Sequence, residues 1–421
     1  MKEVERKGKI FCIGIGGIGL SALARYFAYN GYEVCGSDSN ESELTDTLKS
    51  EGIEVFIGHT GNHISTSFDL IIYSLAVSPD NIDYMTAERT KVTMLSYPEA
   101  LGMVTRSKKT IAVSGTHGKT TTTAMTYSAF KNAGLNPTVI VGSLIGGIGS
   151  NFVPGGDEYF IVEACEYKRS FLNLEPDYLI ITNIDNDHLD YYKDKEDIIS
   201  AFQLFSEKVK QEGAIIMHDA EWDLLRSDKK VRADYVPRNE IELSVFGDHN
   251  RSNAQLVIAL ADELRLSSTL VREGLLSFSG TWRRLEYKGE DAHIWYDDYG
   301  HHPTEIKATL EALREKFPKD KKRVVVIFQP HLYSRTKLLL DDFSMSFDGA
   351  DEVLLLPIYA SREDFDESIT SAMLADKIGE KARVFETKEE VFDYVETIPS
   401  GAVVMTLGAG DVYILHKLRE Q

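Results

Sequence analysis

Short apolar runs alternate along the chain with stretches in which apolar residues recur every three or four positions. In the first hundred residues, the runs predict strands and the periodic stretches predict helices. Strands are expected at Lys9–Ile15, Glu33–Ser37 and Asp69–Ser74, and helices at Ile18–Tyr29 and Pro98–Val104. This alternation is typical of a parallel sheet covered by helices. The polar stretch Thr105–Lys109 then predicts a linker.

The same alternation begins twice more, which predicts three α/β domains at 1–106, 107–281 and 282–421. In the second domain, strands are expected at Thr110–Ser114, Tyr159–Glu163, Tyr178–Asn183 and Ala214–Met217, and helices at Thr120–Asn132, Glu196–Val209 and Asn250–Leu264. In the third, strands are expected at His293–Asp297, Arg323–Phe328, Glu352–Leu356 and Ala402–Leu407, with helices at Pro303–Lys316 and at the C-terminal end.

Composition narrows the class of protein. The chain has 421 residues, of which 43% are hydrophobic and 27% are charged. This length and composition are typical of a globular protein with several domains. Its 46 basic and 66 acidic residues leave a net charge of −20, which argues against a general nucleic-acid-binding protein. No apolar run reaches the roughly 18 residues of a membrane-spanning helix. Cys12, Cys35 and Cys165 suit neither a zinc site nor a disulfide framework, so we expect the reducing cytoplasm.

One segment has an alternative interpretation. Phe11–Ala24 is mostly apolar and follows several basic residues, as a secretory signal peptide does. Glu3 and Glu5 interrupt the basic region, and four glycines interrupt the apolar one. A strand, a glycine turn and a helix therefore explain this segment better.

The first glycine-rich loop, Gly14-Ile15-Gly16-Gly17-Ile18-Gly19, matches G-x-G-x-x-G between a predicted strand and helix. Its glycines permit a tight turn and let a diphosphate approach the backbone at a helix N-terminus. Asp38 follows the next strand, where a dinucleotide-binding domain has its ribose-binding acid. The pattern predicts a dinucleotide or a nucleotide-sugar as ligand; a turn without a ligand is the alternative.

The second loop, S-G-T-H-G-K-T-T-T at 114–122, is a shortened P-loop, with Val113 where the generic pattern has its first glycine. Its N–H groups can surround phosphates, Lys119 can reach the outer phosphates and Thr120 can bind Mg²⁺. Glu163 ends a predicted strand, as the Mg²⁺ carboxylate of P-loop proteins does, or it is a solvated strand end. His188 follows the next strand and could hold a second metal or lie in a surface loop.

Together these segments resemble the ATP-dependent Mur ligases, a family that builds the peptidoglycan precursor and is related to folylpolyglutamate synthases. The resemblance covers the whole chain through G-I-G-G-I-G-L-S-A-L-A (14–24), G-T-H-G-K-T-T-T-T-A (115–124), T-N-I-D-N-D-H-L-D (182–190), G-D-H-N-R-S-N-A (247–254), D-D-Y-G-H-H-P-T-E-I (297–306), Q-P-H-L-Y-S-R-T (329–336) and L-G-A-G-D (407–411). It implies an α/β fold of three domains: Rossmann-like, central P-loop ATPase-like and C-terminal Rossmann-like.

The resemblance also implies an activity. Such an enzyme would ligate L-alanine to UDP-N-acetylmuramate through an acyl phosphate, with ATP and Mg²⁺ as cofactors. It would be a cytoplasmic monomer or weak homodimer that binds neither nucleic acid nor a membrane.

Site residues follow from the same resemblance. The ATP site would comprise Gly115, Thr116, His117, Gly118, Lys119, Thr120, Thr121, Asn250 at the adenine and Asp298 at the ribose. Thr120 and Glu163 would bind one Mg²⁺ and His188 a second. The nucleotide-sugar would contact Gly16, Gly17, Ile18, Gly19, His59 and Ser74, while Arg284, Tyr299, His301, His331 and Arg335 would line the amino-acid and carboxylate end. The candidate catalytic residues are Lys119, His188, His331 and Arg335.

Several of these residues have structural alternatives. Asp298, His301 and His302 could cap the helix at Pro303, and Asn250 could be a helix N-cap. Arg284, His331 and Arg335 could form structural ion pairs, Tyr299 could be a packed aromatic, and His59 and Ser74 could be loop residues. The chain also departs from the family. Leu332 replaces an arginine of several members, and E-A-C-E-Y-K (163–168) replaces E-A-D-E-S-D, so roles tied to the two acids do not transfer.

Three other functions stay open at this point: a ligase that adds a preformed tripeptide to the same nucleotide-sugar, a nicotinamide-dependent oxidoreductase and a non-catalytic nucleotide-binding module. The compact A-C-E-Y-K-R-S-F segment (164–171) favours a single amino acid over a tripeptide. The second phosphate loop argues against the oxidoreductase. Lys119, Thr120, Glu163 and His188 argue against a non-catalytic module.

Overall fold

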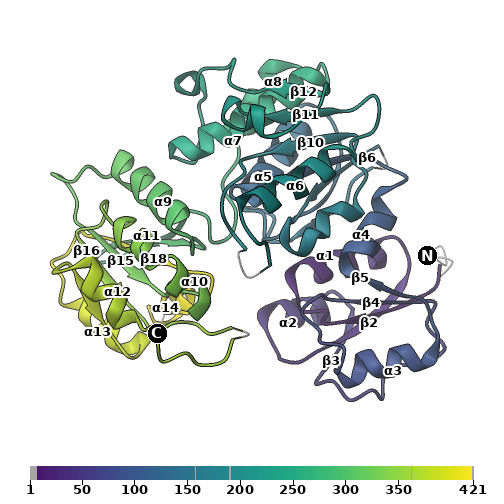
Figure 1. Ribbon diagram of the computed structural model, residues 1–421, viewed down its shortest axis with the longest axis horizontal. Coiled ribbons are helices and arrows are strands. Elements are labelled where there is room, and N and C mark those ends of the chain that lie inside the picture. Colours follow the sequence, from purple (N-terminus) through teal and green to yellow (C-terminus); the bar gives the residue numbers. More distant parts are fainter. Residues whose placement is uncertain (1–6, 157, 189–190, 362, 420–421) are drawn as a thin grey trace. The chain divides into compact units, whose positions relative to one another are not determined.

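The computed structural model describes residues 7–156, 158–188, 191–361 and 363–419. They form three mainly parallel sheets with helices packed against them (Figure 1). The chain divides into two compact units, one of residues 1–240 and 253–278 and the other of residues 241–252 and 279–421. The first unit contains two of the sheets and the second unit contains the third. The predicted three-part α/β fold is confirmed.

The first sheet is parallel throughout and has the order β3-β2-β1-β4-β5. Its strands are β1 (Lys9–Ile13), β2 (Glu33–Asp38), β3 (Glu54–Ile57), β4 (Leu70–Tyr73) and β5 (Met94–Ser96). Its helices are α1 (Ile18–Tyr29), α2 (Glu43–Ser50), α3 (Ile82–Thr90) and α4 (Tyr97–Thr105). The strand order reverses beside β1, between its neighbours β2 and β4. At such a switch point the carboxyl ends of the strands leave a crevice for ligands.

The second sheet has the order β12-β11-β10-β6-β9-β7-β8, with only the β7–β8 pair antiparallel. Its strands are β6 (Lys109–Ser114), β7 (Thr138–Ile140), β8 (Phe152–Val153), β9 (Tyr159–Glu163), β10 (Tyr178–Ile181), β11 (Ala214–Met217) and β12 (Lys230–Arg232). The accompanying helices are α5 (Lys119–Asn132), α6 (Lys195–Ser206), α7 (Asp248–Glu263), α8 (Ser268–Leu276) and the short η1 (Tyr167–Asn173), η2 (Asp219–Leu224) and η3 (Arg238–Glu240). Because β6 lies between β9 and β10, the loop after it sits between the ends of both neighbours.

The third sheet has the order β13-β14-β18-β15-β16-β17, with β13 antiparallel to β14. Its strands are β13 (Glu286–Glu290), β14 (Ile294–Asp298), β15 (Val324–Phe328), β16 (Glu352–Leu355), β17 (Ala382–Val384) and β18 (Val403–Leu407). Its helices are α9 (Pro303–Lys316), α10 (Tyr333–Leu338), α11 (Leu340–Met345), α12 (Ser371–Ile378), α13 (Lys388–Glu396), η4 (Val412–Ile414) and α14 (Leu415–Leu418). The side chains of alternate β15 residues lie in two separate hydrophobic cores. Val324 and Val326 belong to one core, and Val325 and Ile327 belong to the other. This burial on both faces explains the continuous apolar run.

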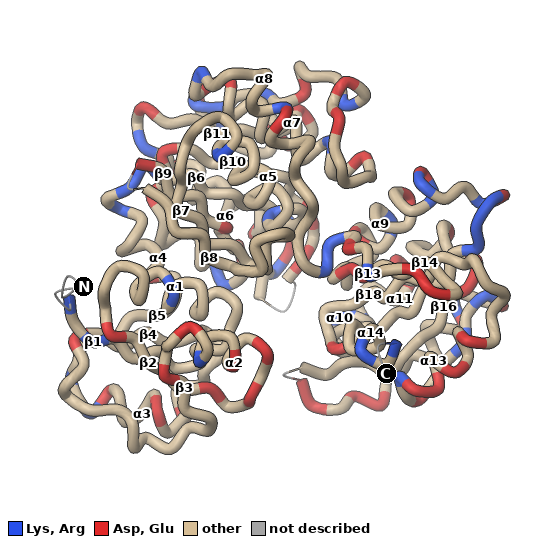
Figure 2. Tube along the Cα trace, turned by 180° about the vertical axis from the view of Figure 1, so that it is seen from behind, with Lys and Arg blue, Asp and Glu red and all other residues tan. Residues whose placement is uncertain are grey.

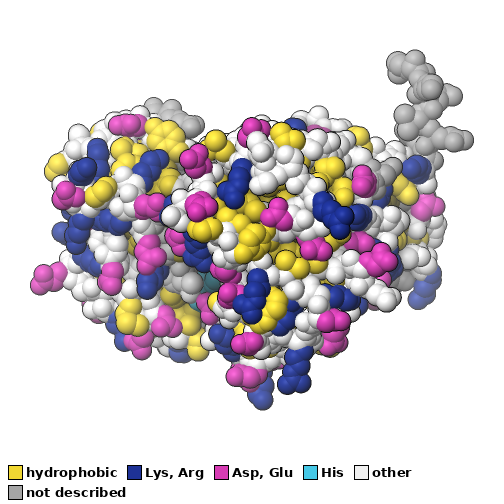
Figure 3. Space-filling view, turned by 90° about the horizontal axis from the view of Figure 1, so that it is seen from above, with side chains coloured by type: hydrophobic (Ala, Val, Ile, Leu, Met, Phe, Trp, Pro, Cys, Tyr) yellow, Lys and Arg dark blue, Asp and Glu magenta, His cyan; other side chains and the backbone are white. Residues whose placement is uncertain are grey.

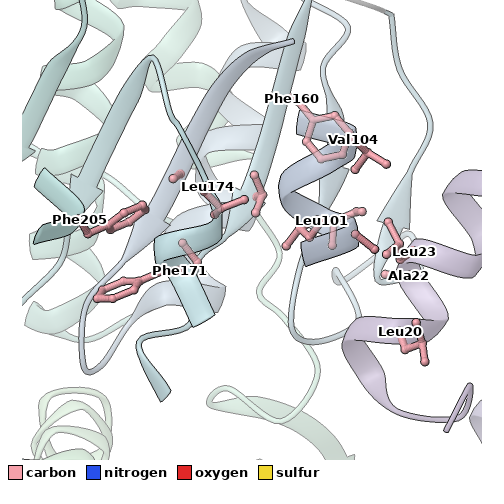
Figure 4. Packing of buried hydrophobic residues seen from close by; sticks show 14 of the residues in the cluster. Leu20, Ala22, Leu23, Leu101, Val104, Phe160, Phe171, Leu174 and Phe205 are labelled. Carbon is pink, nitrogen blue, oxygen red and sulfur yellow. The ribbon is translucent and has the colours of Figure 1, made fainter. Parts of the chain in front are cut away.

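The two sheets of the first unit share one hydrophobic core. Leu20 and Leu23 of α1 and Leu101 of α4 belong to the same buried cluster as Phe160 and Phe171 of the second sheet (Figure 4). Polar contacts reinforce the join, since Asn151 Nδ2 donates to the carbonyl of Ile18 at 2.6 Å. The two glycine loops are therefore held on one packed body.

The predicted linker is mostly regular structure. Thr105 is the last residue of α4, and its hydroxyl donates to the carbonyl of Leu101. Lys109 is already the first residue of β6, so only residues 106–108 connect the two elements. The hydroxyl of a threonine can donate to a backbone carbonyl one turn earlier in the same helix. A polar residue such as Thr105 can therefore belong to a helix end that its polarity does not predict.

Lys and Arg are interspersed with Asp and Glu along the tube of both units (Figure 2). One face shows hydrophobic side chains between charged ones (Figure 3). Cys12, Cys35 and Cys165 are free thiols. In the described part of the chain, no helix combines the length and the apolar character that crossing a bilayer requires.

Candidate active site

The first glycine loop connects β1 to α1 at the switch point of the first sheet. Gly14 has φ +80°, and a Cβ there would lie 3.0 Å from Cβ of Ser74. A Cβ on Gly19 would lie 2.7 Å from Cζ of Tyr97. No side chain caps α1 at Gly17, so the first N–H groups of the helix are left for another acceptor. The predicted strand, glycine turn and helix are confirmed, and Ser74 lies beside the loop.

Asp38 does not present an open carboxylate to a ribose. Its Oδ2 accepts a hydrogen bond from the Gly16 N–H at 2.8 Å, and this bond links the end of β2 to the glycine loop. The expected ribose-binding position is therefore used within the loop itself.

His59 belongs to a buried network near the end of β2. Its Nδ1 lies 2.9 Å from Asp83 Oδ2, and Asp83 also accepts from Ser37 Oγ at 2.6 Å and from Gly61 N–H at 2.6 Å. Burial opposes the ionised form of Asp83, but the hydrogen bonds from Ser37, His59 and Gly61 outweigh it and lower its pKa. The sequence analysis missed Asp83, because nothing in its sequence neighbourhood indicates that α3 delivers it to this loop.

The second glycine loop is held by the end of β10. Thr116 N–H donates to the carbonyl of Asn183 at 3.0 Å, and His117 N–H donates to Asn183 Oδ1 at 2.9 Å. Gly118 has φ +83°, and a Cβ there would lie 2.8 Å from Asn253 Oδ1. No side chain caps α5, so its first N–H groups, from Lys119 onward, have no side-chain acceptor and can bind an anion. Asn183 and Asn253 are further residues that the sequence analysis missed.

Lys119 lies at the first position of α5 with its ammonium folded back over the loop. Nζ donates to the carbonyls of Gly115 at 2.6 Å and Thr116 at 2.9 Å, and to Glu166 at 3.0 Å. Burial opposes the charged ammonium, but Glu166 and then Cys165 outweigh it and raise the pKa of Lys119. The side chain is therefore a permanent cation inside the loop.

Thr120 and Glu163 lie beside each other. Thr120 Oγ1 donates to Glu163 Oε2 at 3.0 Å, and Gly142 N–H donates to the same oxygen at 2.8 Å. A hydroxyl and a carboxylate at the end of a P-loop are the ligand types that hold nucleotide-bound Mg²⁺. Among the described residues, no three His, Cys, Asp or Glu side chains converge as a metal site.

His188 faces the same centre from the loop after β10. Its Nε2 lies 3.3 Å from Glu166 Oε1, and its ring is 4.8 Å from that of Tyr167. Glu166 thus contacts both Lys119 and His188, although the sequence analysis gave it no role. The motif difference at 163–168 was the available signal, but it pointed away from this residue.

A cavity of about 250 Å³ runs between the first glycine loop and Glu163. Its lining includes Ile18, Gly19, Tyr97, Glu163 and Cys165. Cys165 adds a free thiol to this lining, and the residue is exposed. The same cavity is thus lined both by the first glycine loop and by Glu163.

The second unit holds Asn250, Arg284, Asp298, Tyr299 and His301. Asn250 is the third residue of α7, and its Nδ2 donates to the carbonyl of Phe246 at 2.8 Å. Asp298 accepts from the N–H groups of Leu285 and Gly300, both at 2.7 Å, and burial raises its pKa to about 6. Neither residue caps a helix, so that alternative is wrong for both.

The cap of α9 is His302 instead. Its Nδ1 accepts from Thr304 N–H at 3.3 Å, and Glu305 returns the interaction to the N–H of His302. Glu305 also lies 3.6 Å from Arg284 Nη1 and 3.5 Å from His301 Nδ1. The guanidinium of Arg284 lies 5.2 Å from the ring centre of Tyr299. Arg284, Tyr299 and His301 are therefore brought together at the C-terminal end of β14.

His331 and Arg335 meet at the end of β15. Arg335 Nη1 lies 3.3 Å from His331 Nδ1, and the His331 ring stacks on Tyr359 and meets the edge of His301, each at 5.8 Å. Leu332 has φ +72°, an unusual conformation for leucine, and its side chain is buried. The His301 contact joins this group to the residues at the end of β14.

Arg283 is a residue of this region that the sequence analysis missed. It is buried and donates to Asp297 Oδ2 at 2.8 Å and to the carbonyls of Gly408 and Gly410, at 2.5 and 3.0 Å. It therefore joins the ends of β14 and β18. Its immediate neighbour Arg284 is only half-buried, which the sequence could not distinguish.

Known proteins resemble the chain over nearly its full length. Residues 9–109 match the Mur ligase family, catalytic domain; residues 113–237 the Mur ligase middle domain; and residues 283–410 the Mur ligase, glutamate ligase domain. The chain therefore belongs to the Mur ligase family. Members of this family are ATP-dependent ligases, so the interpretation as a nicotinamide-dependent oxidoreductase is excluded.

Individual relatives are named more narrowly. UDP-N-acetylmuramate–L-alanine ligases of Caldicellulosiruptor saccharolyticus and Clostridium acetobutylicum are 40% and 39% identical, each over 96% of this chain and 96% of the relative. The crystal structure of a UDP-N-acetylmuramate-alanine ligase from Thermotoga maritima superimposes with a TM-score of 0.81 at 29% identity, and 98% of each chain is covered.

Proposed function

We propose that this chain joins L-alanine to UDP-N-acetylmuramate and converts ATP to ADP and phosphate, a step in the synthesis of the peptidoglycan precursor. The observation that carries the proposal is the cavity between the first glycine loop and Glu163. A nucleotide-sugar bound at Gly16–Gly19 could extend its carboxylate along this cavity toward a γ-phosphate held by the second loop. The 40% and 39% identical relatives named for this reaction support the choice of substrates.

The first loop, His59 and Ser74 would bind the nucleotide-sugar. The second loop (Gly115–Thr121) would bind the phosphates of ATP through the N–H groups at the start of α5. Lys119 would donate to the β- and γ-phosphates. Asn250 and Asp298 would meet the adenine and the ribose. The domains that we propose for these ligands are 1–106 for the nucleotide-sugar, 107–281 for ATP and 282–421 for the amino acid.

Thr120 Oγ1 and Glu163 Oε2, 3.0 Å apart, fit a nucleotide-bound Mg²⁺, and His188 is our candidate for a second. When bound, Mg²⁺ neutralises the charge that develops on the transferring phosphoryl group. The role of the chain is to hold these groups still and to exclude water from the cavity, since phosphoryl transfer depends mainly on positioning and charge.

The reaction would proceed in two steps. A carboxylate oxygen of the substrate attacks the γ-phosphorus, the bond to ADP breaks and an acyl phosphate forms. The amine of alanine then attacks the carbonyl carbon and loses a proton, and phosphate leaves with the C–O electron pair. His331 and Arg335, with Arg284, Tyr299 and His301, would orient the amino acid. We extend the proposal to a cytoplasmic enzyme, monomeric or weakly dimeric, with no nucleic-acid or membrane ligand.

The test is phosphate release from ATP in the presence of UDP-N-acetylmuramate and one amino donor at a time. L-alanine should give the highest kcat/KM, with glycine and L-serine below it. A higher value for the preformed tripeptide would replace this proposal with the recycling reaction. A parallel titration should find UDP-N-acetylmuramate binding and no NADH binding.

A further inference from the structure

Glu166 lies at the centre of the proposed nucleotide site without an assigned task. Only 2% of its side chain is exposed, and its backbone carbonyl accepts from the hydroxyl of Tyr192 at 2.5 Å. Its carboxylate oxygens lie 2.9 and 3.0 Å from Lys119 Nζ and 3.3 Å from His188 Nε2. Two basic side chains therefore converge on one buried carboxylate.

Lys119 has no proton left for a phosphate in this arrangement. An ammonium has three N–H donors, and Nζ is surrounded by three acceptors: Gly115 O, Thr116 O and Glu166. To contact a γ-phosphate, the ammonium must release at least one of them. Glu166 is the partner that a phosphate replaces most directly, because both are anions that compete for the same cation.

Once Lys119 moves, Glu166 needs another cation. A buried carboxylate that loses its partner is strongly destabilised, since neither water nor charge then compensates it. His188 stays beside it, and an imidazole nitrogen with a carboxylate oxygen is a common pair of metal ligands. The protein therefore presents a cation position that an ammonium fills when no nucleotide is bound.

We propose that Glu166 exchanges cations during the reaction cycle: it holds the Lys119 ammonium before ATP binds, and with His188 it binds a divalent cation after Lys119 has turned to the phosphates. This inference rests on the proposed function, which supplies the nucleotide and the second metal. It adds Glu166 as a ligand of that metal and couples metal binding to the movement of the lysine.

The first experiment uses neither nucleotide nor turnover. Mn²⁺ binding is measured by the electron paramagnetic resonance signal of the free ion. Lys119→Ala should bind Mn²⁺ at least tenfold more tightly than the parent, because the ammonium no longer occupies the position. Adding Glu166→Gln should remove the gain, whereas adding Glu221→Gln, in η2, should leave it. Equal Mn²⁺ affinities of the parent and Lys119→Ala would overturn the exchange.

The second experiment counts Mn²⁺ ions in the presence of a non-hydrolysable ATP analogue and UDP-N-acetylmuramate. The parent should bind two ions, and Glu166→Gln should keep the nucleotide-linked ion and lose the other. Glu166→Asp should weaken the second ion less, and Glu221→Gln, which alters a half-buried carboxylate elsewhere in this unit, should behave as the parent. Two ions of unchanged affinity in Glu166→Gln, or loss of the nucleotide as well, would refute the ligand role. A parent that binds no nucleotide would instead contradict the proposed function.

Discussion

Glu163 Oε2 accepts a hydrogen bond from Thr120 Oγ1 at 3.0 Å, although the two residues are 43 positions apart in the sequence. The contact exists because β6 and β9 are adjacent and parallel, so the loop after β6 begins beside the last residue of β9. It joins the start of α5 to the end of a strand.

Removing the hydroxyl tests the metal role of this pair. In Thr120→Ala, one proposed Mg²⁺ ligand is lost, and we expect kcat/KM for ATP to fall on the order of a hundredfold, about 2.7 kcal/mol. Thr120→Ser keeps the hydroxyl and should stay within about fivefold. Steady-state phosphate release at varied ATP and Mg²⁺ measures both. Rates of the alanine variant near those of the parent would exclude Thr120 as a ligand.

The Gly118→Ala variant can be compared with Gly134→Ala, because the two glycines have the same backbone conformation. Gly118 and Gly134 have φ of +83° and +85°, but a Cβ on Gly118 would lie 2.8 Å from Asn253 Oδ1, whereas Gly134 faces open space. Both alanine variants should lose about 1 kcal/mol of stability, because alanine disfavours positive φ. Only Gly118→Ala should also weaken ATP binding, by tenfold or more. Thermal unfolding and calorimetric titration separate the two effects, and equal ATP affinities would show that the loop tolerates the side chain.

Arg335 is expected to bind the carboxylate of alanine. A guanidinium can form two parallel hydrogen bonds with a carboxylate, and lysine cannot. Arg335→Lys should raise the KM for alanine more than tenfold, since a lost charge-assisted bond costs roughly 1.5–3 kcal/mol. The KM for ATP should change little.

The control for this variant is Arg323→Lys. Arg323 directly precedes β15, at the opposite end of the strand from His331, and its guanidinium pairs with Glu352 at 2.6 Å. It should leave both KM values unchanged. If Arg335→Lys raises the KM for ATP and leaves that for alanine, Arg335 belongs to the nucleotide instead.

His416 predicts a pH dependence of stability. Its Nε2 lies 2.8 Å from Thr406 Oγ1, and burial together with Lys288, Arg419 and Arg283 lowers its pKa to about 3. The unfolded chain takes up a proton near the ordinary value of about 6.5, so between these pH values it binds more protons than the folded chain. Stability should therefore fall as the pH falls, by at most about 1.4 kcal/mol per pH unit from this group.

His416→Gln should make the stability of the second unit less dependent on pH between roughly 4 and 6. Trp295, whose ring centre lies 5.8 Å from that of His416, provides a fluorescence signal in urea unfolding. His63→Gln replaces an exposed histidine of the first unit and serves as the control. An unchanged slope in His416→Gln would show that another group titrates in this range.

The sequence predicted most of the long elements to within one to three residues, because each pairs an apolar run or a helical repeat with a local stop signal. The helix Pro303–Lys316 was predicted at its observed bounds, with proline at its first turn. Short strands such as β3, β5 and β12 were not predicted, since three or four residues carry too little periodicity. Their existence depends on neighbouring strands that complete their hydrogen bonds.

The sequence by itself determined the two glycine loops, the Lys119–Thr120 pair and the family resemblance, because these are local patterns in which residue type and spacing express the chemistry. Only the tertiary structure decided which acid meets which base. Glu166 pairs with Lys119 and His188, and Asp38 closes the first loop onto Gly16. The physical reason is that strand order, not sequence separation, determines which loops lie side by side at the edge of a sheet. A carboxylate that is unremarkable in the chain therefore becomes the counter-charge of the site.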